Sequence, residues 1–475
     1  MIHQADSHPE RKDRVSGVTD IQQLKAELES QGVRYVFGAY TDAHGVPKSK
    51  CVPIAHLADA AAGSELYTVG ALEGMGDLGP NEDECVGIPD LSAVTVLPWD
   101  RRYAVAPANL YFHGEPYSHD FRRILQNQLG EAASMGLRMN MGVEPEVYVL
   151  RETESGVRPW VSEDLHNEPT RGYDLETTIL ADPFLEPMVE YINELGWDVY
   201  SFDHEGGDGQ YEFDFGYTDA LQMADRMIIF RLMAKHVART LGCFASFMPK
   251  PFQTSFGSGA HLNVSLADLE SGRNLFEGRS GWNGETGPID HSQAYSTIAY
   301  QFTAGVLAHG AALMAVLSPT VNSYKRLMPR GLMQEISWAP VFQAWGYNNR
   351  TLMARLPMNR RCLEVRTADS AVNFYLGTAL VLAAGLDGIR QELDPADPVN
   401  IDTYKVSETE LAAMGVRRLP RTLGEAVTAF EESGFVQKVL GTELHASYAQ
   451  FKREEWQEYN TVVSEWERSK YLRLW

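Results

Sequence analysis

Acidic side chains recur at every second position in two runs that are otherwise rich in strand-forming residues. Glu144 and Glu146 flank a proline, and Gln210, Glu212 and Asp214 alternate with aromatic residues further along the chain. Because side chains in a strand alternate between faces, each run places its polar groups together on one face. A buried carboxylate without a partner is costly, so this face must meet water, cations or both.

Three further side chains extend this acidic set. Glu205 precedes the second run, His261 follows a glycine-rich turn, and Glu364 stands two residues before Arg366. Taken singly, each has a plainer interpretation, as part of a solvated sheet face or as a turn residue. Five glutamates and one histidine on strands of one region are typical of hard divalent ions bound mostly by oxygen. Two such ions would hold a triphosphate while a phosphoryl group moves.

Arginines supply the second half of this chemistry, at positions Arg326, Arg350, Arg355 and Arg366. Guanidinium groups suit carboxylate and phosphate, although a surface salt bridge is the alternative for any one of them. Together with the metal-binding acids they indicate phosphoryl transfer to a carboxylic acid, which is the first step of an amide ligase. The sequence contains neither a P-loop nor a kinase-type glycine-rich loop, so the common nucleotide-binding folds are not supported.

The elements that position these residues fall into two regions. Residues 21–32 predict a short helix, and residues 33–40 and 46–52 predict the two strands of a hairpin. Beyond residue 115, predicted strands alternate with predicted helices, which is typical of an α/β domain that carries its chemistry on the sheet. The strands are predicted at 138–150, 197–202, 210–217, 243–248 and 261–265, and the helices at 119–136, 183–196 and 219–241.

We therefore expect a small domain at 19–115 and a catalytic domain at 116–475, after a disordered tail at 1–18. The apolar segment Thr303 to Leu317 predicts a buried helix, because it is too short and too interrupted to span a membrane. Near the C-terminus, apolar side chains at roughly helical spacing predict core packing rather than a partner site, namely Tyr448, Phe451, Tyr459, Val462 and Trp466.

The charge of the chain excludes one class of partner. Its 41 basic and 64 acidic residues give a net charge of −23, whereas binding to nucleic acid requires a basic surface. Four scattered cysteines form neither a disulfide framework nor a zinc motif. A reducing, cytoplasmic location without a membrane or nucleic-acid partner is the expectation.

Five motifs occur in order along the chain, at residues 142–146 (GVEPE), 257–261 (GSGAH), 319–326 (PTVNSYKR), 349–350 (NR) and 363–366 (LEVR). In this order they resemble the motifs of the glutamine synthetase superfamily, and the resemblance runs from about residue 33 to the C-terminus. Residues 42–45 (DAHG), 248–251 (MPKP) and 337–340 (SWAP) make it closest to the branch of γ-glutamylmethylamide synthetases and similar γ-glutamyl-amine ligases. It implies an α+β protein with a small N-terminal β-grasp-like domain and a large C-terminal domain on a curved, antiparallel-rich sheet.

The resemblance also implies a role for each candidate residue. Glu146, Glu205 and Glu212 would bind one Mg²⁺ or Mn²⁺ ion, and Glu144, His261 and Glu364 would bind the other. Asn263, Ser265, Arg350 and Arg355 match positions that contact ATP, and Gly257, Arg326 and Arg366 match positions near glutamate. Arg350 and Arg366 would act in catalysis. Glutamate would first take the γ-phosphoryl group of ATP, and an amine would then displace phosphate from γ-glutamyl phosphate.

The resemblance further implies a homo-oligomer, the dodecamer of two stacked hexamers that is common in the family. In such a ring each active site lies between the large domain of one subunit and the small domain of its neighbour. The substrates would be glutamate and an amine.

Two departures from the family pattern concern the amine. The aspartate that helps to bind ammonium is replaced by Thr68 or Val69, and the flap glutamate is replaced by Trp338, with Glu335 as a possible substitute. An aromatic, less acidic pocket favours an organic amine, such as aniline or a short alkylamine, over ammonia and over cationic polyamines. The alternatives are an ammonia-using glutamine synthetase and a non-catalytic relative with a structural or sensing role.

A third departure lies beside Glu364. Cys362 occupies a position where relatives carry an arginine, and either Arg360 or Arg361 would have to replace that contact.

Overall fold

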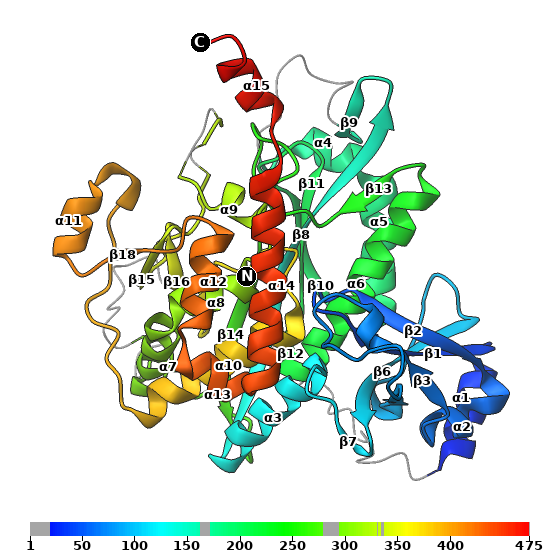
Figure 1. Cartoon of the computed structure of the whole chain (residues 1–475). Coiled ribbons are helices and arrows are strands. Elements are labelled where there is room, and N and C mark those ends of the chain that lie inside the picture. Colours follow the sequence, from blue (N-terminus) through cyan, green and yellow to red (C-terminus); the bar gives the residue numbers. More distant parts are fainter. Residues whose placement is uncertain (1–19, 162–171, 279–293, 330, 334–336, 475) are drawn as a thin grey trace.

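The computed structural model describes residues 20–161, 172–278, 294–329, 331–333 and 337–474. The predicted tail and Glu335 lie outside these residues. Within them, the strands form two sheets, one built from residues 35–116 and one from residues 137–418. Figure 1 shows the smaller sheet at the lower right of the molecule, beside the larger body.

The smaller sheet follows the predicted helix and hairpin. Helix α1 (Ile21–Ser30) begins after Asp20, whose carboxylate accepts hydrogen bonds from two backbone amides of the first turn. The strand order is β2-β1-β6-β4-β3, with β5 and β7 paired to β6 and α2 (Leu57–Ala61) beside it. The strands are β1 (Tyr35–Thr41), β2 (Pro47–Pro53), β3 (Glu65–Tyr67), β4 (Cys85–Pro89), β5 (Thr95–Val96), β6 (Tyr103–Phe112) and β7 (Glu115–Pro116).

The larger sheet has the order β10-β11-β8-β14-β17-β16-β15-β18, and β9, β12 and β13 also pair with β8. Its described pairs are antiparallel except β15 with β16. The strands predicted in this region are confirmed. They are β8 (Leu137–Thr153), β9 (Gly156–Pro159), β10 (Val199–His204), β11 (Gln210–Phe215), β12 (Thr218–Asp219), β13 (Phe244–Ser246), β14 (Ala260–Asp268), β15 (Phe342–Tyr347), β16 (Leu352–Leu356), β17 (Leu363–Val365) and β18 (Arg417–Arg418).

Helices cover one side of this sheet. Helices α3 and α6 contact β8, α7 contacts β15 and β16, and α10 packs against α3, α6, α7 and α8. The described α-helices after the smaller sheet are α3 (Phe121–Ser134), α4 (Leu175–Leu180), α5 (Asp182–Glu194), α6 (Ala220–Thr240), α7 (Thr297–Ala308), α8 (Gly310–Leu317), α9 (Ser323–Arg326), α10 (Phe374–Arg390), α11 (Glu408–Ala413), α12 (Leu423–Glu431), α13 (Gly434–Leu440), α14 (Thr442–Thr461) and α15 (Glu465–Tyr471).

Helices α7 and α10 approach closely because glycines face each other at their crossing. A Cβ atom on Gly305 would lie 2.0 Å from the Ala384 carbonyl oxygen, and one on Gly388 would lie 2.1 Å from the Gln301 carbonyl oxygen. Any larger residue at either glycine would push the two helices apart. The glycines therefore fix the helical layer behind the sheet.

The segment predicted as one buried helix is two helices. Helices α7 and α8 meet at His309 with a bend of 76°, and the His309 imidazole bonds the Asp387 carboxylate of α10 at 2.8 Å. The prediction of burial is confirmed for most of this segment. No single helix among the described residues is long and apolar enough to cross a membrane, and only this bent pair reaches the required length and hydropathy together.

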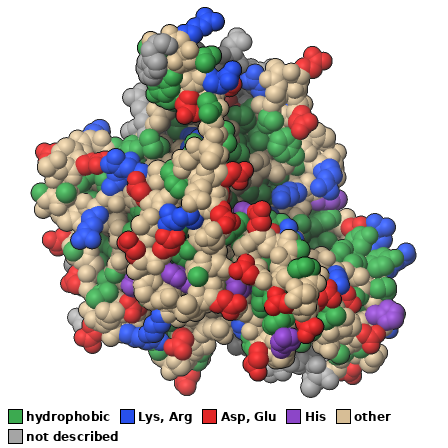
Figure 2. Space-filling view, in the orientation of Figure 1, with side chains coloured by type: hydrophobic (Ala, Val, Ile, Leu, Met, Phe, Trp, Pro, Cys, Tyr) green, Lys and Arg blue, Asp and Glu red, His purple; other side chains and the backbone are tan. Residues whose placement is uncertain are grey.

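The prediction of a packed C-terminus is only half right. Tyr448 and Phe451 are buried, whereas Tyr459, Val462 and Trp466 are exposed. Tyr459 lies in the last turn of α14, which ends at Thr461, and Val462 and Trp466 follow that end, where the chain continues into α15 at the top of the molecule in Figure 1. Elsewhere, Figure 2 shows acidic side chains spread across the visible face among basic and apolar ones, rather than gathered into one patch.

Candidate active site

Strand pairing in the larger sheet brings the predicted metal ligands together. Glu212 of β11 lies opposite Glu146 of β8, and Glu205 directly follows β10. Ligand oxygens of these three glutamates all lie within 4.8 Å of one another. The three carboxylates thus lie together for two reasons: the i, i+2 spacing of the acids in the sequence, and the register of β8 with β11.

A second group forms on the other side of β8. His261 of β14 lies opposite Glu144, and its Nδ1 atom is 3.2 Å from one Glu144 oxygen and 3.8 Å from one Glu364 oxygen. Ligand atoms of Glu144, Glu212 and His261 lie within 4.8 Å of one another. Glu212 therefore belongs to both groups, while Glu364 stands beside His261 at the edge of the second.

Burial and mutual repulsion act on these acids. Burial, followed by the neighbouring Glu205, raises the pKa of Glu146 to about 8, and burial, followed by Glu144 and Glu205, raises the pKa of Glu212 well above its ordinary value. Like charges held together in a buried position favour a cation between them. The donors are carboxylates with one imidazole, so they suit Mg²⁺ or Mn²⁺.

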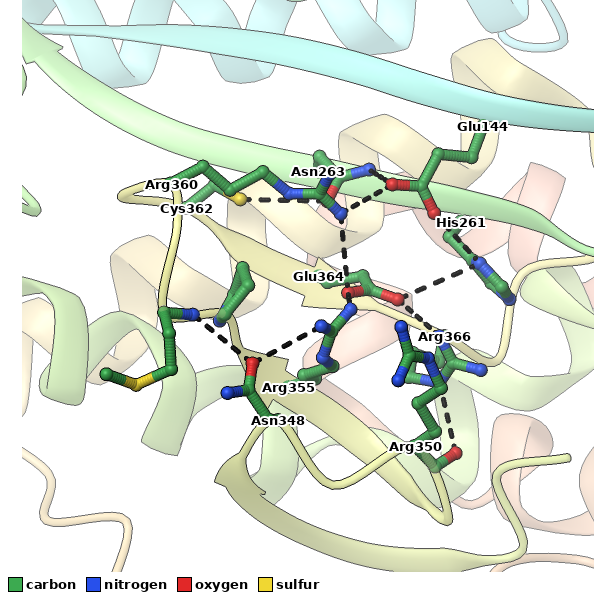
Figure 3. Close-up of polar contacts among 12 residues, drawn as sticks. Glu144, His261, Asn263, Asn348, Arg350, Arg355, Arg360, Cys362, Glu364 and Arg366 are labelled. Carbon is green, nitrogen blue, oxygen red and sulfur yellow. Dashed lines mark hydrogen bonds and ion pairs between the residues drawn. The ribbon is translucent and has the colours of Figure 1, made fainter. Parts of the chain in front are cut away.

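The pKa of Glu364 is shifted in the opposite direction to those of Glu146 and Glu212. Its carboxylate is completely buried, and burial alone would raise its pKa. Arg366 and Arg355 outweigh that effect and hold the pKa below its ordinary value. Arg355 Nη1 lies 2.5 Å from one Glu364 oxygen, and Arg366 bonds the other, as Figure 3 shows.

Arg366 also links this carboxylate to two loops. Its Nε donates to the Arg350 carbonyl at 3.0 Å and its Nη2 donates to the Trp338 carbonyl at 3.4 Å. Arg350 itself is exposed, beside Arg355 and Arg366. The structure therefore brings Arg350, Arg355 and Arg366 to one place, next to Glu364.

The residues predicted to surround glutamate also lie at this site. Arg326 is buried, and its Nη2 donates to the Arg366 carbonyl at 3.1 Å and lies 3.4 Å from His261 Nε2. A Cβ atom on Gly257 would lie 2.6 Å from Arg326 Cγ and from the Pro249 carbonyl oxygen. Only glycine leaves room for Arg326 to reach this position.

The predicted nucleotide-contacting residues of β14 stand beside the second metal group. Asn263 Nδ2 donates to Glu144 at 3.1 Å, and Asn263 lies opposite Glu364 in the pairing of β14 with β17. Ser265 is two residues further along the same strand, so it shares the face of His261 and Asn263.

The predicted amine-binding residues are not assembled within one chain. Thr68 is exposed and donates to Glu84 at 2.8 Å, whereas Val69 is completely buried in the core. Among the described residues, no hydrogen bond, ion pair or hydrophobic cluster joins this pair to Trp338. Figure 1 shows β3 and β15, the strands that precede and follow these segments, on opposite sides of the molecule.

Trp338 is held by its backbone while its indole projects outward. Its φ of 56° lies in the left-handed region, which is strained for a bulky residue. Its carbonyl accepts the hydrogen bond from Arg366, and the carbonyl of the next residue, Ala339, accepts one from the Tyr404 hydroxyl. The side chain remains 54% exposed.

Sequence reasoning did not include Gln210 among the site residues. Its Nε2 donates to Glu146 at 2.7 Å and to the Gly257 carbonyl at 3.2 Å, so it ties the first metal group to the glycine-rich turn. The sequence pattern could have indicated this role, because Gln210 shares one strand face with Glu212.

Comparisons with known proteins identify the family of the chain. Residues 118–471 match the family described as glutamine synthetase, catalytic domain. The chain is 37% identical over 448 residues to a glutamate–methylamine ligase of Methyloversatilis universalis, covering 94% of this chain and 98% of that protein. It is 34% identical over 449 residues to a glutamine synthetase of Rhizobium meliloti, covering 94% and 99%.

The structure is similar to a solved structure of GmaS in complex with ADP. The TM-score is 0.84 at 34% sequence identity, and the match covers 94% of this chain and 99% of that one. The α+β fold class predicted from the sequence is confirmed by this match and by the family match.

Proposed function

The chain belongs to the glutamine synthetase family, and from that premise we propose that it joins L-glutamate to an organic amine through γ-glutamyl phosphate. The reaction class is that of a glutamate–amine ligase, which forms a γ-glutamyl amide. Within that class, we propose an arylamine such as aniline, or a short alkylamine, as the nitrogen donor. We place the reaction in amine catabolism or detoxification in the cytoplasm, a setting consistent with four unpaired cysteines.

The observation that carries the proposal is the convergence of acids and arginines on one sheet face. Glu146, Glu205 and Glu212 would hold one divalent ion, and Glu144, His261 and Glu364 the other. When bound, such ions neutralise the phosphate charge of ATP.

The arginines would bind the two anionic substrates. Arg350 and Arg355, with Asn263 and Ser265, would contact the nucleotide, because guanidinium groups suit its phosphates. Arg326 lies beside Gly257 and bonds the Arg366 carbonyl, and the two arginines would orient the glutamate carboxylate towards the phosphoryl group. Orientation and charge neutralisation are the contributions that phosphoryl transfer requires.

Trp338 supports an organic amine rather than ammonia. Ammonium arrives charged and needs a carboxylate to bind and deprotonate it, whereas Trp338 offers an exposed apolar ring. An arylamine is already neutral near pH 7 and requires little proton abstraction. An apolar substituent would also gain by contact with the indole.

We further propose that the amine pocket is completed by a second copy of the chain. The exposed Thr68 lies in the small domain and Trp338 lies in the large one, without a described contact between them. A ring in which the small domain of one subunit covers the large domain of the next would bring them together. The dodecamer of two stacked hexamers expected for the family has this arrangement.

The deciding experiment measures ADP release from ATP, glutamate and Mg²⁺ with a panel of amines. The panel contains ammonia, methylamine, isopropylamine, aniline and putrescine, and mass spectrometry identifies each product. We expect an organic amine to exceed ammonia in kcat/KM by at least tenfold, which corresponds to about 1.4 kcal/mol. The Glu364→Ala variant should release no ADP with any amine, because it lacks one predicted metal ligand.

The other outcomes are equally informative. A preference for ammonia would identify the chain as a glutamine synthetase that lacks the usual ammonium-binding carboxylates. No ADP release with any member of the panel would favour a non-catalytic relative. Full turnover by Glu364→Ala would contradict the assignment of Glu364 as a ligand.

A further inference from the structure

The turn between β16 and β17 carries two adjacent arginines that point to different places. Arg360 Nη2 lies 2.5 Å from a Glu144 oxygen and 3.6 Å from a Glu364 oxygen. Arg361 instead donates to the Met358 carbonyl at 2.9 Å and stacks over the Tyr295 ring at 5.3 Å. Figure 3 shows the Arg360 guanidinium between the two carboxylates.

Arg360 therefore holds the position of a counter-ion between two proposed ligands of the second metal ion. A guanidinium that bonds Glu144 this closely competes with a divalent cation for the same oxygen atoms. Two cations a few ångströms apart also repel each other, with an energy that grows as the site loses water. A cation bound by Glu144, His261 and Glu364 would consequently displace Arg360 from Glu144.

The exposure of the three arginines around Glu364 indicates which of them can move. The side chain of Arg360 is 34% exposed, whereas those of Arg355 and Arg366 are 11% and 7% exposed. Arg366 is also fixed by the backbone carbonyls of two loops. Arg360 is the least confined, so it is the arginine that can turn away when a cation arrives.

Once released, Arg360 would still lie at the edge of the site, next to Asn263. Cys362, two residues later, is buried with its Sγ 3.6 Å from Asn263 Oδ1, and its thiol offers no positive charge there. The planar guanidinium of Arg360 presents several N–H donors, which suit phosphate oxygens. The released guanidinium of Arg360 would then lie beside a nucleotide bound at Asn263.

We propose that Arg360 has two successive partners: it neutralises Glu144 and Glu364 before metal binds, and it binds a phosphate of the nucleotide after metal has displaced it. This inference rests on the proposed function, because it requires an ATP- and metal-dependent site. Arg360 would then be a nucleotide-binding residue, and metal binding would increase the affinity for the nucleotide.

The test uses the Arg360→Gln variant of the full chain and Mn²⁺ alone, without nucleotide. Removing a charge-assisted competitor should tighten Mn²⁺ binding about tenfold, measured by calorimetry or by the electron paramagnetic resonance signal of free Mn²⁺. The same variant should show a KM for ATP about tenfold higher, with the KM for glutamate changed less than about twofold. For both Mn²⁺ affinity and the KM for ATP, Arg360→Lys should give values between those of the unmodified chain and of Arg360→Gln, because lysine keeps the charge without the planar guanidinium.

Arg361→Gln is the matched control, since it removes the neighbouring arginine of the same turn and should change neither quantity. If Arg360→Gln weakens Mn²⁺ binding or leaves it unchanged, Arg360 is not a competing counter-ion and the inference is wrong. An unchanged KM for ATP would equally overturn it. Failure of the unmodified chain to release ADP would instead contradict the proposed function, while the Mn²⁺ titration would still decide the competition between Arg360 and metal.

Discussion

The replacement Trp338→Ala tests the proposed amine pocket most directly. Trp338 keeps 54% of its surface exposed, which for a side chain of about 250 Å² leaves about 130 Å² available. An apolar substituent that covers about half of this area gains about 1.6 kcal/mol at about 25 cal/mol per Å². We therefore expect kcat/KM for isopropylamine or aniline to fall about 15-fold.

Ammonia serves as the control within the same variant, because it has no substituent to cover the indole. Its kcat/KM should change less than about twofold, and Trp338→Phe should retain most of the activity with the organic amine. Steady-state ADP release with each amine at saturating ATP and glutamate measures these values. An equal loss with ammonia and with the organic amine would refute the reasoning, and would show that Trp338 acts through the hydrogen bond between its carbonyl and Arg366.

Two further predictions concern buried charges. Arg122→Met should lower the free energy of unfolding by about 3–5 kcal/mol, because Asp225 and Asp90 lose the guanidinium that bonds them at 3.0 and 2.9 Å; urea unfolding that matches the unmodified chain would contradict this. Burial, followed by Arg326, lowers the pKa of Lys250 from 10.5 to about 8. Above pH 8 the folded state therefore releases this proton before the unfolded state does, and the free energy of unfolding of the unmodified chain should rise by about 3 kcal/mol relative to that of Lys250→Met between pH 8 and 10.5. Lys250→Met should lack that gain, so parallel stability curves for the two proteins would disprove the assignment.

The sharing of one strand face by acidic side chains could be predicted from the sequence because strand periodicity needs no tertiary information. Glu144 and Glu146 are two residues apart in one strand, and side chains at that spacing lie on the same face. Which strands lie beside β8 could not be read in the same way. The pairing of Glu146 with Glu212 and of Glu144 with His261 depends on long-range register, which is set by packing of the whole sheet.

Local breaks in regular structure also could not be predicted from the sequence. A buried helix was predicted across His309, but its hydrogen bond to Asp387 and the glycine that follows it accompany a sharp bend. Arg360 and Arg361 are adjacent in the sequence, and only the path of the turn decides which reaches Glu144. Apolar residues at helical spacing share one face only within one continuous helix. Trp466 follows the end of α14, so its spacing from Tyr448 and Phe451 did not predict its burial.

The contrast between Glu364 and Trp338 has a consequence for how such an enzyme can change during evolution. Glu364 is completely buried in a paired strand, so a substitution there would disturb the register, the neighbouring arginines and the proposed phosphoryl transfer together. Trp338 lies in a loop with half of its side chain in solvent, attached to the site through a backbone carbonyl that any residue possesses. Mutations at position 338 can therefore be sampled at little cost to folding or to ATP use. With Trp338 in the proposed amine pocket, nitrogen donors could diverge among related enzymes while the ligase chemistry stays constant.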